Sequence, residues 1–410
     1  MKIAVCSLSE FTYVAEFVDA AMILSERHEV VYFLGYRSPA ALELLESRGI
    51  RYEVLLDHPP LLQGPAKVES TEMLFTEFFF KQAGLVLPAL LKRLEAWGAE
   101  AVASHLRDFA GVNAAEILGI PLVSFGSHAT PVRTECLDPP FGGGLARTSS
   151  HAQRSMMWRL HHEFNHKLDQ HYNRLLRFPH GLNAVQGCTT HSSTRLVLLS
   201  LIASLGNTHS LLPDHVHYVG SLYSRINNAA DEWERTVHAQ IRERPHPRIF
   251  VSLGTTYGSG LLPKCIDALA DFQGTVIASG TDTRSAKHLI TAPFFKDVDA
   301  VLKACDAVVT ICGGKTVMDA LAHGLPMIGL PCQGEQKEIA LALAEHGAAV
   351  LPCLRKWDAR NFNEAVMAVS TVETYRLAAA QLQTESVSAG GAEKAVSEIE
   401  NLLSKTSSFA

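Results

Sequence analysis

The sequence predicts an α/β protein with two successive domains, each a parallel sheet covered by helices. At 410 residues the chain is too long for one hydrophobic core. Short apolar runs alternate with longer amphipathic segments, which is the order of βαβ units and therefore of parallel sheets. The alternation runs through the first half, stops at a polar stretch and starts again, so we expect two domains of similar size.

The composition is that of an ordinary globular protein, with 47% hydrophobic and 19% charged residues and a formal net charge of −6 at pH 7. A protein with a negative net charge does not attract a polyanion electrostatically, so nucleic acid is not an expected partner. The sequence shows no secretory start, no CxxC pair and no apolar stretch of about 18 residues. We therefore expect a cytoplasmic protein without a transmembrane segment, whose eight cysteines are reduced thiols.

The first domain is expected over residues 1–221. Ser38-Pro39 opens one of its helices and Gly49 closes it, with proline and glycine at the helix positions that favour them. Two long stretches, 56–82 and 126–152, interrupt the alternation and are expected to be functional or covering segments. The predicted strands cover 3–6, 28–33, 50–55, 100–104, 121–125, 196–201 and 216–219, and the predicted helices cover 13–27, 38–49, 84–98, 110–118 and 153–177.

A polar, charged and unpatterned segment, 222–246, is expected to be the linker. The second domain follows over 247–385, and a last helix lies within 386–410. Its predicted strands cover 249–253, 275–278, a short run reaching Phe295, 308–311, 327–330 and 348–351. Its predicted helices cover 261–272, 298–304, 316–323, 335–346 and two within 358–384, and the last helix covers 392–404.

The most informative stretch is 308–336, which is predicted to fold as strand, tight turn, helix and strand. Gly313 and Gly314 stand at the turn, where glycine lets backbone N–H groups approach a ligand. The following helix offers unpaired N–H donors and a positive dipole end, so the turn suits a phosphate. Glu335 and Gln336 follow the second strand and are suited to sugar hydroxyls. The alternative is that Glu335 is simply an acid at a helix N-terminus.

Five segments carry a resemblance to a known family: Val251–Thr255, Asp306–Thr310, Thr316–Pro326, Gly334–Gln336, and His217–Gly220 together with Gly390–Ala392. They resemble the nucleotide-sugar glycosyltransferases of the GT-B superfamily, and within it the family 1 enzymes of bacterial natural-product pathways. The resemblance implies two Rossmann-like domains that face each other across a cleft. The first would bind a small, apolar acceptor, and the second a UDP- or dTDP-hexose.

What the resemblance implies chemically is an inverting transfer without a metal or another cofactor, the nucleotide sugar being a co-substrate. The second domain would supply the donor site: Gly313, Gly314, Lys315 and Thr316 at the diphosphate, Thr255 or Thr256 from the facing turn, Phe295 stacked on the base, and Glu335 and Gln336 at the sugar. The family's His-Gly-Gly loop is here Ile311-Cys312-Gly313, so we expect Lys315 to replace the missing charge. Uridine and thymidine both remain open as the base.

The general base departs from the family pattern. The family places a His after the first strand, where this chain has Thr12 or Tyr13, and a supporting Asp after a later strand, where it has His105. Tyrosine and threonine are poor bases near neutral pH. We therefore expect His105 to be the base, oriented by Glu10 or Asp108, with a structural histidine as the alternative. Phe75, Phe78 and Phe79 either line the acceptor pocket or form the buried face of a helix.

Other motifs and functions are less well supported. His162, Glu163 and His166 satisfy the H-E-x-x-H pattern, but a zinc hydrolase would need a further ligand that the sequence does not suggest, so no metal site is expected. Gly314-Lys315-Thr316 lacks the first glycine of a P-loop. The remaining alternatives are a GT-B-fold sugar-nucleotide epimerase and a non-catalytic homologue that acts as a partner protein. A homodimer is also open.

Overall fold

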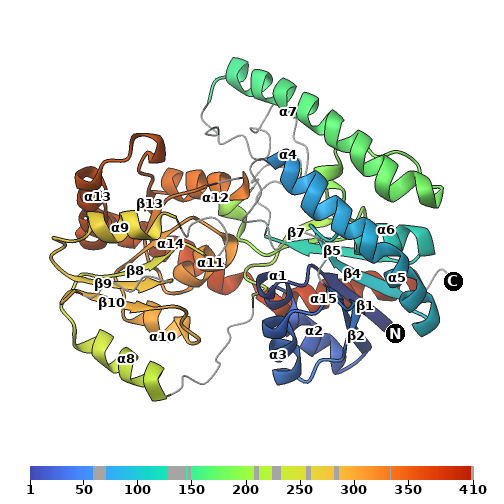
Figure 1. The fold of residues 1–410 in the computed structure, drawn as a ribbon, viewed down its shortest axis with the longest axis horizontal. Coiled ribbons are helices and arrows are strands. Elements are labelled where there is room, and N and C mark those ends of the chain that lie inside the picture. The colour runs from blue at the N-terminus through green and yellow to red at the C-terminus, as the bar shows by residue number, and fades with distance from the viewer. Residues whose placement is uncertain are drawn as a thin grey trace.

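The computed structural model describes residues 1–58, 71–127, 145, 149–206, 212–223, 232–254, 260–280, 286–332 and 334–407. These residues form two α/β domains that lie side by side, each with helices on both faces of a parallel sheet (Figure 1). The predicted fold class is confirmed. Each predicted strand corresponds to a strand of the structure.

The sheet of the first domain has seven strands in the order β3-β2-β1-β4-β5-β6-β7, and every neighbouring pair is parallel. The chain winds outward from β1 in both directions, so the switch point lies between β1 and β4. Ligands of open α/β sheets bind outside the carboxyl ends of the strands at such a point. The strands are β1 Lys2–Ser7, β2 Glu29–Tyr36, β3 Tyr52–Leu56, β4 Ala101–His105, β5 Leu122–Gly126, β6 Val197–Leu199 and β7 Val216–Tyr218.

The helices of the first domain differ from the prediction in one place that matters. The helix expected over 13–27 is broken at Glu16 and Phe17, where Phe17 leaves the helical conformation with φ −125° and ψ 1°. The helices are α1 Phe11–Ala15, α2 Val18–Ser25, α3 Pro39–Ser47, α4 Thr71–Met73, α5 Lys81–Trp97, α6 Phe109–Leu118 and α7 His151–Tyr172. The π-helical turns are η2 Leu74–Phe80 and η3 Asn173–Arg177, and the 3-10 turns are η4 Phe178–His180, η5 Cys188–Thr190 and η6 Ala203–Leu205.

Residues 74–97 form one helix through η2 and α5, so the end of the expected covering segment 56–82 is helical. By length and composition, this is the one helix of the described residues that could cross a membrane. Its most apolar window is 56% buried inside the protein, as in a core helix. The segment 59–70 and most of the loop 126–152 lie outside the described residues.

The second sheet repeats the design with six parallel strands in the order β10-β9-β8-β11-β12-β13. Its switch point lies between β8 and β11. The strands are β8 Arg248–Ser252, β9 Thr275–Ser279, β10 Leu289–Ala292, β11 Ala307–Thr310, β12 Met327–Gly329 and β13 Ala349–Val350. The helices are α9 Leu262–Ala268, α10 Val298–Lys303, α11 Gly314–Ala322, α12 Gly334–Glu345, α13 Ala359–Thr371, α14 Glu373–Ser388 and α15 Gly391–Ser407, with a 3-10 turn η7 Leu354–Lys356.

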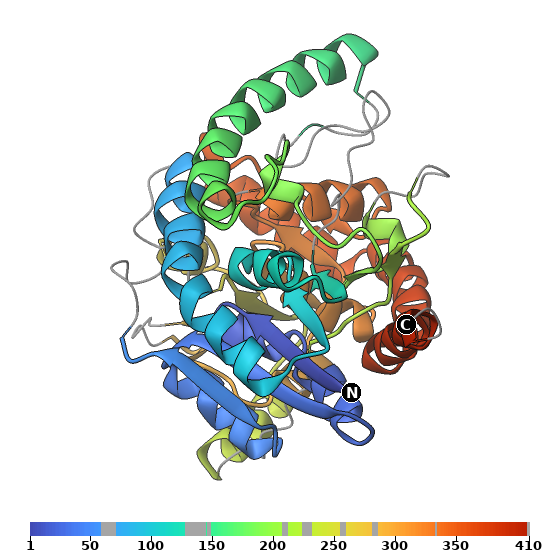
Figure 2. The same cartoon turned by 90° about the vertical axis from the view of Figure 1, so that its right-hand side faces the viewer.

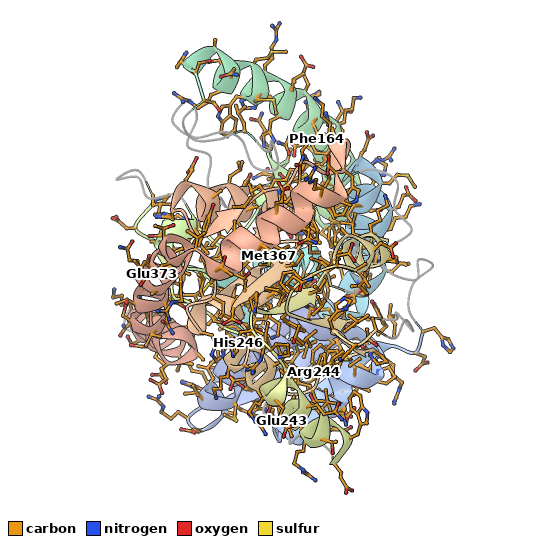
Figure 3. The ribbon with its side chains drawn as sticks, turned by 90° about the vertical axis from the view of Figure 1, so that its left-hand side faces the viewer. Phe164, Glu243, Arg244, His246, Met367 and Glu373 are labelled. Atoms are coloured by element: carbon orange, nitrogen blue, oxygen red, sulfur yellow. The ribbon has the colours of Figure 1, made fainter. Side chains whose placement is uncertain are left out.

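The segment expected to be an unpatterned linker contains a helix. Helix α8, Glu232–Glu243, buries Val237 and Ile241 in the core of the second domain. Its apolar positions are four residues apart and were hidden by the many charges between them. Figure 3 views the second domain from outside and shows Glu243, Arg244 and His246 together where α8 leads into β8.

The last helix returns to the first domain. Helix α15 packs against α2, and its buried residues Ala395, Val396, Ile399 and Leu403 belong to the first domain's core. In Figures 1 and 2 this red helix lies beside the blue strands of the first domain. The two domains are therefore joined by a second crossing of the chain.

Candidate active site

The two switch points meet at the boundary between the domains. Ser127 directly follows β5, next to β4, and Gly314 begins α11 directly after the turn that follows β11. A methyl group on Gly314 would lie 2.7 Å from the Cβ of Ser127, so glycine is required at this approach. A methyl group on the preceding Gly313 would meet nothing within 4 Å. The start of α11 thus combines a close contact with the first domain and open space for a ligand.

The predicted diphosphate residues occupy the first turn of α11. Lys315 is partly exposed, and its Nζ lies 2.5 Å from Oδ2 of Asp319, one turn further along the helix. Thr316 is half-buried on the same turn. Thr255 and Thr256, predicted on the facing turn, lie outside the described residues. The charge that Lys315 brings to this end of α11 is therefore partly balanced by Asp319.

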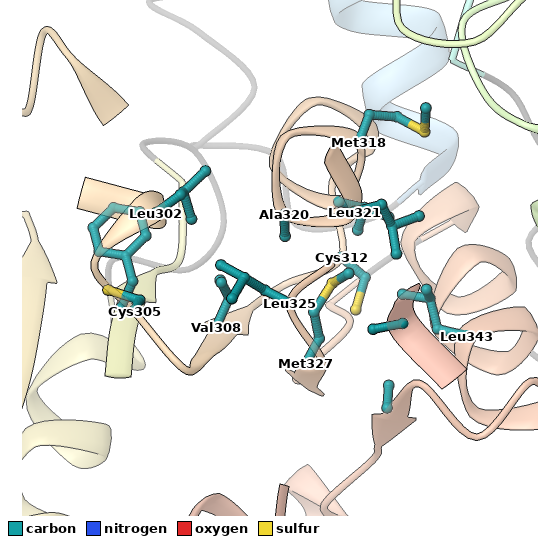
Figure 4. Packing of buried hydrophobic residues seen from close by; sticks show 14 of the residues in the cluster. Leu302, Cys305, Val308, Cys312, Met318, Ala320, Leu321, Leu325, Met327 and Leu343 are labelled. Carbon is teal, nitrogen blue, oxygen red and sulfur yellow. The ribbon is translucent and has the colours of Figure 1, made fainter. Parts of the chain in front are cut away.

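Cys312 lies in the Ile311-Cys312-Gly313 segment that replaces the His-Gly-Gly loop of the resembled family, and its side chain points into the core. The backbone of Cys312 is left-handed, with φ 62°, and its Sγ lies 2.8 Å from where a methyl group on Gly329 would be. Figure 4 shows Cys312 among Leu321, Met327 and Leu343. Burial raises the pKa of this thiol to about 12, so it is protonated and packs as an apolar group.

Glu335 and Gln336 begin helix α12 behind this turn. The carboxylate of Glu335 is 30% exposed, and its Oε2 lies 3.9 Å from a guanidinium nitrogen of Arg107 in the first domain. Gln336 is buried, and its Oε1 accepts a hydrogen bond from the backbone of Cys332 at 3.0 Å. Gln336 therefore shapes the loop before α12, whereas Glu335 faces the domain boundary.

Phe295, predicted to stack on a nucleotide base, is fully buried and is not available for that role. Its ring packs against His238, with centroids 6.5 Å apart, and against Phe250, with centroids 6.0 Å apart. The preceding residue, Phe294, is 56% exposed. Of the two neighbouring rings, Phe295 is therefore the one in the core and Phe294 the one that faces outward.

His105 ends β4 and is held within the protein through both ring nitrogens. Its Nδ1 accepts a hydrogen bond from the backbone N–H of Arg107 at 2.9 Å, so the proton of the neutral ring lies on Nε2. Nε2 lies 3.0 Å from Oε2 of Glu16, and the two side chains are 2% and 1% exposed. The orienting carboxylate is thus Glu16, in the break between α1 and α2, and not Glu10 or Asp108. The edge of Tyr13 contacts the same ring, with centroids 4.9 Å apart.

Glu10 is the acidic group of the loop after β1 and precedes α1. Its Oε1 accepts a hydrogen bond from the hydroxyl of Tyr36 at 2.6 Å. Its other oxygen, Oε2, has no hydrogen-bond partner among the described residues. Burial raises the pKa of Glu10 above that of a free side chain, although the bond from Tyr36 opposes this effect.

Asp108 caps helix α6 and does not contact the ring of His105 through a hydrogen bond in the described part of the chain. Its Oδ1 accepts from the backbone N–H groups of Ala110 at 3.1 Å and Gly111 at 3.3 Å. Burial raises the pKa of Asp108 to about 6, even though these bonds and the nearby imidazole favour the charged form. Asp108 is therefore the N-cap residue of α6.

The predicted acceptor residues divide between a pocket and the core. Phe75, Phe78 and Phe79 are each at most 4% exposed, and they pack in one aromatic cluster with Phe80 and Phe109. Phe79 also lines a pocket under the carboxyl ends of β1, β2 and β3, together with Arg107 and Asp108. Phe75 and Phe78 do not line that pocket and form the buried face of the helix.

Three residues of this region were not predicted from the sequence: Glu16, Arg107 and Ser127. Arg107 is a charged residue two positions after the buried strand β4, which could have marked it as a site residue. Glu16 had no such signal, because it was expected inside a continuous helix. Ser127 is placed by its contact with the second domain, which only the tertiary structure provides.

The histidines of the H-E-x-x-H pattern lie on the outside of α7. His162, Glu163 and His166 are exposed. Within the described ranges, no three histidine, cysteine or acidic side chains are grouped so that they could hold a metal ion.

Comparison with known proteins finds similarity to glycosyltransferases. Residues 264–402 match the family described as erythromycin biosynthesis protein CIII-like, C-terminal domain. A PGL/p-HBAD biosynthesis glycosyltransferase of Mycobacterium tuberculosis is 29% identical over 212 residues, which are 50% of this chain and 48% of that protein. The chain thus spans about half the length of that relative. The 4'-demethylrebeccamycin synthase of Lentzea aerocolonigenes is 25% identical over 409 residues, covering 94% of this chain and 95% of that protein.

Solved structures share the fold over almost the whole chain. The glycotransferase of kitacinnamycin superimposes with a TM-score of 0.77 at 17% identity, covering 98% of this chain and 99% of that one. A spinosyn rhamnosyltransferase complexed with thymidine diphosphate gives a TM-score of 0.68 at 18% identity, covering 98% and 100%. At such identities the likeness concerns the fold.

Proposed function

We propose that this chain is a family 1 glycosyltransferase of the GT-B superfamily that transfers a hexose from a UDP- or dTDP-sugar, with inversion and without a metal, to a small acceptor. The acceptor is a hydroxyl or amine of an apolar natural product. The observation that carries the proposal is the start of α11, where Gly313 faces open space and Gly314 touches Ser127 of the first domain.

The start of α11 suits a leaving diphosphate. When the acceptor attacks the anomeric carbon, negative charge grows on the phosphate oxygen that leaves. Backbone N–H groups and the positive end of a helix stabilise such charge without a metal ion. Lys315 adds a cation on the same turn, partly balanced by Asp319. The sugar would lie towards Glu335, whose carboxylate can accept hydrogen bonds from its hydroxyls.

The acceptor must lose a proton, and Glu10 is the group that we assign to take it. Glu10 has a carboxylate oxygen without a partner among the described residues, and its raised pKa is closer to neutral, as a general base requires. Both nitrogens of His105, the base predicted from the sequence, are engaged by Arg107 and Glu16. We therefore assign His105 a supporting role beneath the site.

The nucleotide base would stack on Phe294 in place of Phe295. Phe294 is exposed and follows β10 on the carboxyl side of the second sheet, where dinucleotide-type folds bind their ligands. Two structural neighbours, the glycosyltransferase VinC and a spinosyn rhamnosyltransferase, were solved as complexes with dTDP, which favours thymidine over uridine in the first donor to test. The similarity to a PGL/p-HBAD biosynthesis glycosyltransferase and to a 4'-demethylrebeccamycin synthase supports a natural-product acceptor.

The proposal is tested with purified protein in two steps. A thermal-shift panel compares dTDP, UDP and their hexose derivatives, because a ligand that binds only the folded state raises its stability by RT ln(1 + [L]/Kd). The donor that binds is then incubated with apolar phenolic and macrolide alcohols, with and without EDTA, and the products are analysed by mass spectrometry and NMR.

A glycosylated product of inverted anomeric configuration, formed equally with EDTA, is the expected result. A rearranged nucleotide sugar without transfer would instead indicate an epimerase. Nucleotide-sugar binding without turnover of any kind would indicate a non-catalytic homologue. Absence of binding by every nucleotide in the panel would contradict the proposal.

A further inference from the structure

We propose that Arg107 of the first domain positions the carboxylate of Glu335 in the second domain for the hydroxyls of the donor sugar, so that sugar recognition is shared between both domains. Arg107 is a positioning residue here, because it acts through Glu335. This inference deepens the proposed nucleotide-sugar transfer and rests on it.

Arg107 is held firmly on the side of the first domain. It is 5% exposed, and its guanidinium lies 5.0 Å from the ring centre of Phe75 and 5.9 Å from that of Phe79. One guanidinium nitrogen donates to the backbone carbonyl of Thr189 at 3.2 Å. A planar guanidinium that packs on aromatic rings loses little freedom when it forms a further bond, so these contacts fix the direction of the edge that faces the second domain.

That edge points to Glu335. Its second guanidinium nitrogen lies 3.9 Å from Oε2 of Glu335, across the domain boundary. This distance is longer than a direct hydrogen bond, so the guanidinium attracts the carboxylate but does not take up the hydrogen-bond acceptor sites of Oε2. Glu335 is 30% exposed, and it can accept hydrogen bonds from a ligand while the arginine stays in place.

The position of Glu335 on its own domain is also constrained. It is the second residue of α12, and the loop before it is held by the bond from the Cys332 backbone to Gln336. A carboxylate that is both ionised and oriented accepts hydroxyl hydrogen bonds better than one that is free to rotate. The guanidinium of Arg107 attracts this carboxylate, and because Arg107 lies in the first domain, the effect depends on the two domains being together.

One consequence separates this role from a structural one. The nucleoside diphosphate part of the donor does not need Glu335, whereas the hexose does. Loss of Arg107 should therefore weaken the contribution of the hexose to binding and leave the affinity for the nucleoside diphosphate unchanged. A residue that only stabilises the fold would weaken both affinities by the same factor.

The test measures, by isothermal titration calorimetry, the Kd values of dTDP, dTDP-glucose, UDP and UDP-glucose. Each Kd is measured for the wild type and for four variants: Arg107→Gln, Arg107→Lys, Glu335→Gln and the double variant Arg107→Gln/Glu335→Gln. We expect Arg107→Gln to reduce the ratio of diphosphate Kd to nucleotide-sugar Kd about tenfold, and Arg107→Lys to reduce it less. The double variant should match Glu335→Gln alone, since the two side chains act through one carboxylate.

Arg177→Lys is the matched control, because Arg177 is equally buried but binds Glu116 within the first domain, and it should leave the ratio unchanged. An unchanged ratio in Arg107→Gln, an equal loss for both ligands, or additive effects in the double variant would overturn the inference. So would a wild-type protein that binds the diphosphate and the nucleotide sugar equally. If wild type binds none of the four ligands, the proposed function itself fails. Should Arg107→Gln not fold, the Arg107→Lys variant completes the same cycle with Glu335→Gln.

Discussion

Nε2 of His105 lies 3.0 Å from the carboxylate of Glu16, and both side chains are almost completely buried. Glu16→Ala would leave the ring N–H without its acceptor in an apolar environment. We expect a loss of about 3 kcal/mol in the free energy of unfolding, measured by urea denaturation. Glu364→Ala is the control, because Glu364 and its partner Arg360 are both exposed, and it should cost less than about 1 kcal/mol. Equal effects of the two substitutions would contradict this view of the buried pair.

Glu10→Gln tests the general base. The amide cannot take a proton, so kcat should fall by about 10²–10⁴ while the Kd of the donor stays the same. In wild type, the rate should fall as the pH drops below the raised pKa of Glu10, because only the carboxylate can act as a base. The same kinetic measurement on His105→Asn decides between the two residues. If Glu10→Gln keeps near-normal turnover while a folded His105→Asn loses turnover, the imidazole of His105 is the base.

Lys315→Ala tests the cation at the start of α11. Removal of the ammonium should weaken binding of the nucleoside diphosphate about tenfold, as titration calorimetry would measure. Asp319→Asn is the natural control, because it removes the partner of Lys315 and keeps the cation, so diphosphate affinity should stay the same or rise. An inactive Lys315→Ala variant that binds the donor normally would refute the diphosphate role.

Asp108→Asn tests the cost of a buried charge. The pKa of Asp108 is raised from 3.8 to about 6 in the folded protein, so the folded state binds a proton more tightly than the unfolded state does. The contribution of this group to stability is therefore largest below pH 4 and declines as the pH rises to 6. Asparagine keeps an acceptor for the N-cap and has no charge to bury.

The stability of Asp108→Asn relative to wild type should increase by up to about 3 kcal/mol between pH 4 and pH 7. Urea denaturation at several pH values measures this difference. A difference that does not change with pH would show that the carboxyl group is not perturbed in this way.

Phe294→Ala and Phe295→Ala separate nucleotide binding from folding. Phe295 is fully buried, so its truncation should cost about 3–5 kcal/mol in the free energy of unfolding. Phe294 is 56% exposed, and its truncation should change stability little but weaken nucleotide binding about tenfold. Thermal unfolding and calorimetry measure the two effects. Unchanged nucleotide affinity in Phe294→Ala would remove this residue from the donor site.

The sequence predicted the strands and their parallel arrangement well, because buried strands are short apolar runs that local composition defines. It also predicted the glycine turn before α11. The sequence did not predict which of the adjacent rings, Phe294 or Phe295, is buried, because this depends on how the segment after β10 packs on the core. Glu16 was missed because a break in the first helix, and not a motif, brings it to His105. The position of Arg107 after a buried strand was a usable signal, but its contact with Glu335 forms between the two domains and cannot be predicted from local sequence.

Helix α15 has a consequence for how this protein can be divided. It follows the second domain in sequence, yet its apolar side covers the first, in contact with α2. A cut between the two sheets would expose the apolar surface around α2 on one fragment and the apolar side of α15 on the other. Both fragments would then be prone to aggregation. The protein is better divided by circular permutation, with the last helix expressed ahead of β1 through a flexible linker, than by simple truncation.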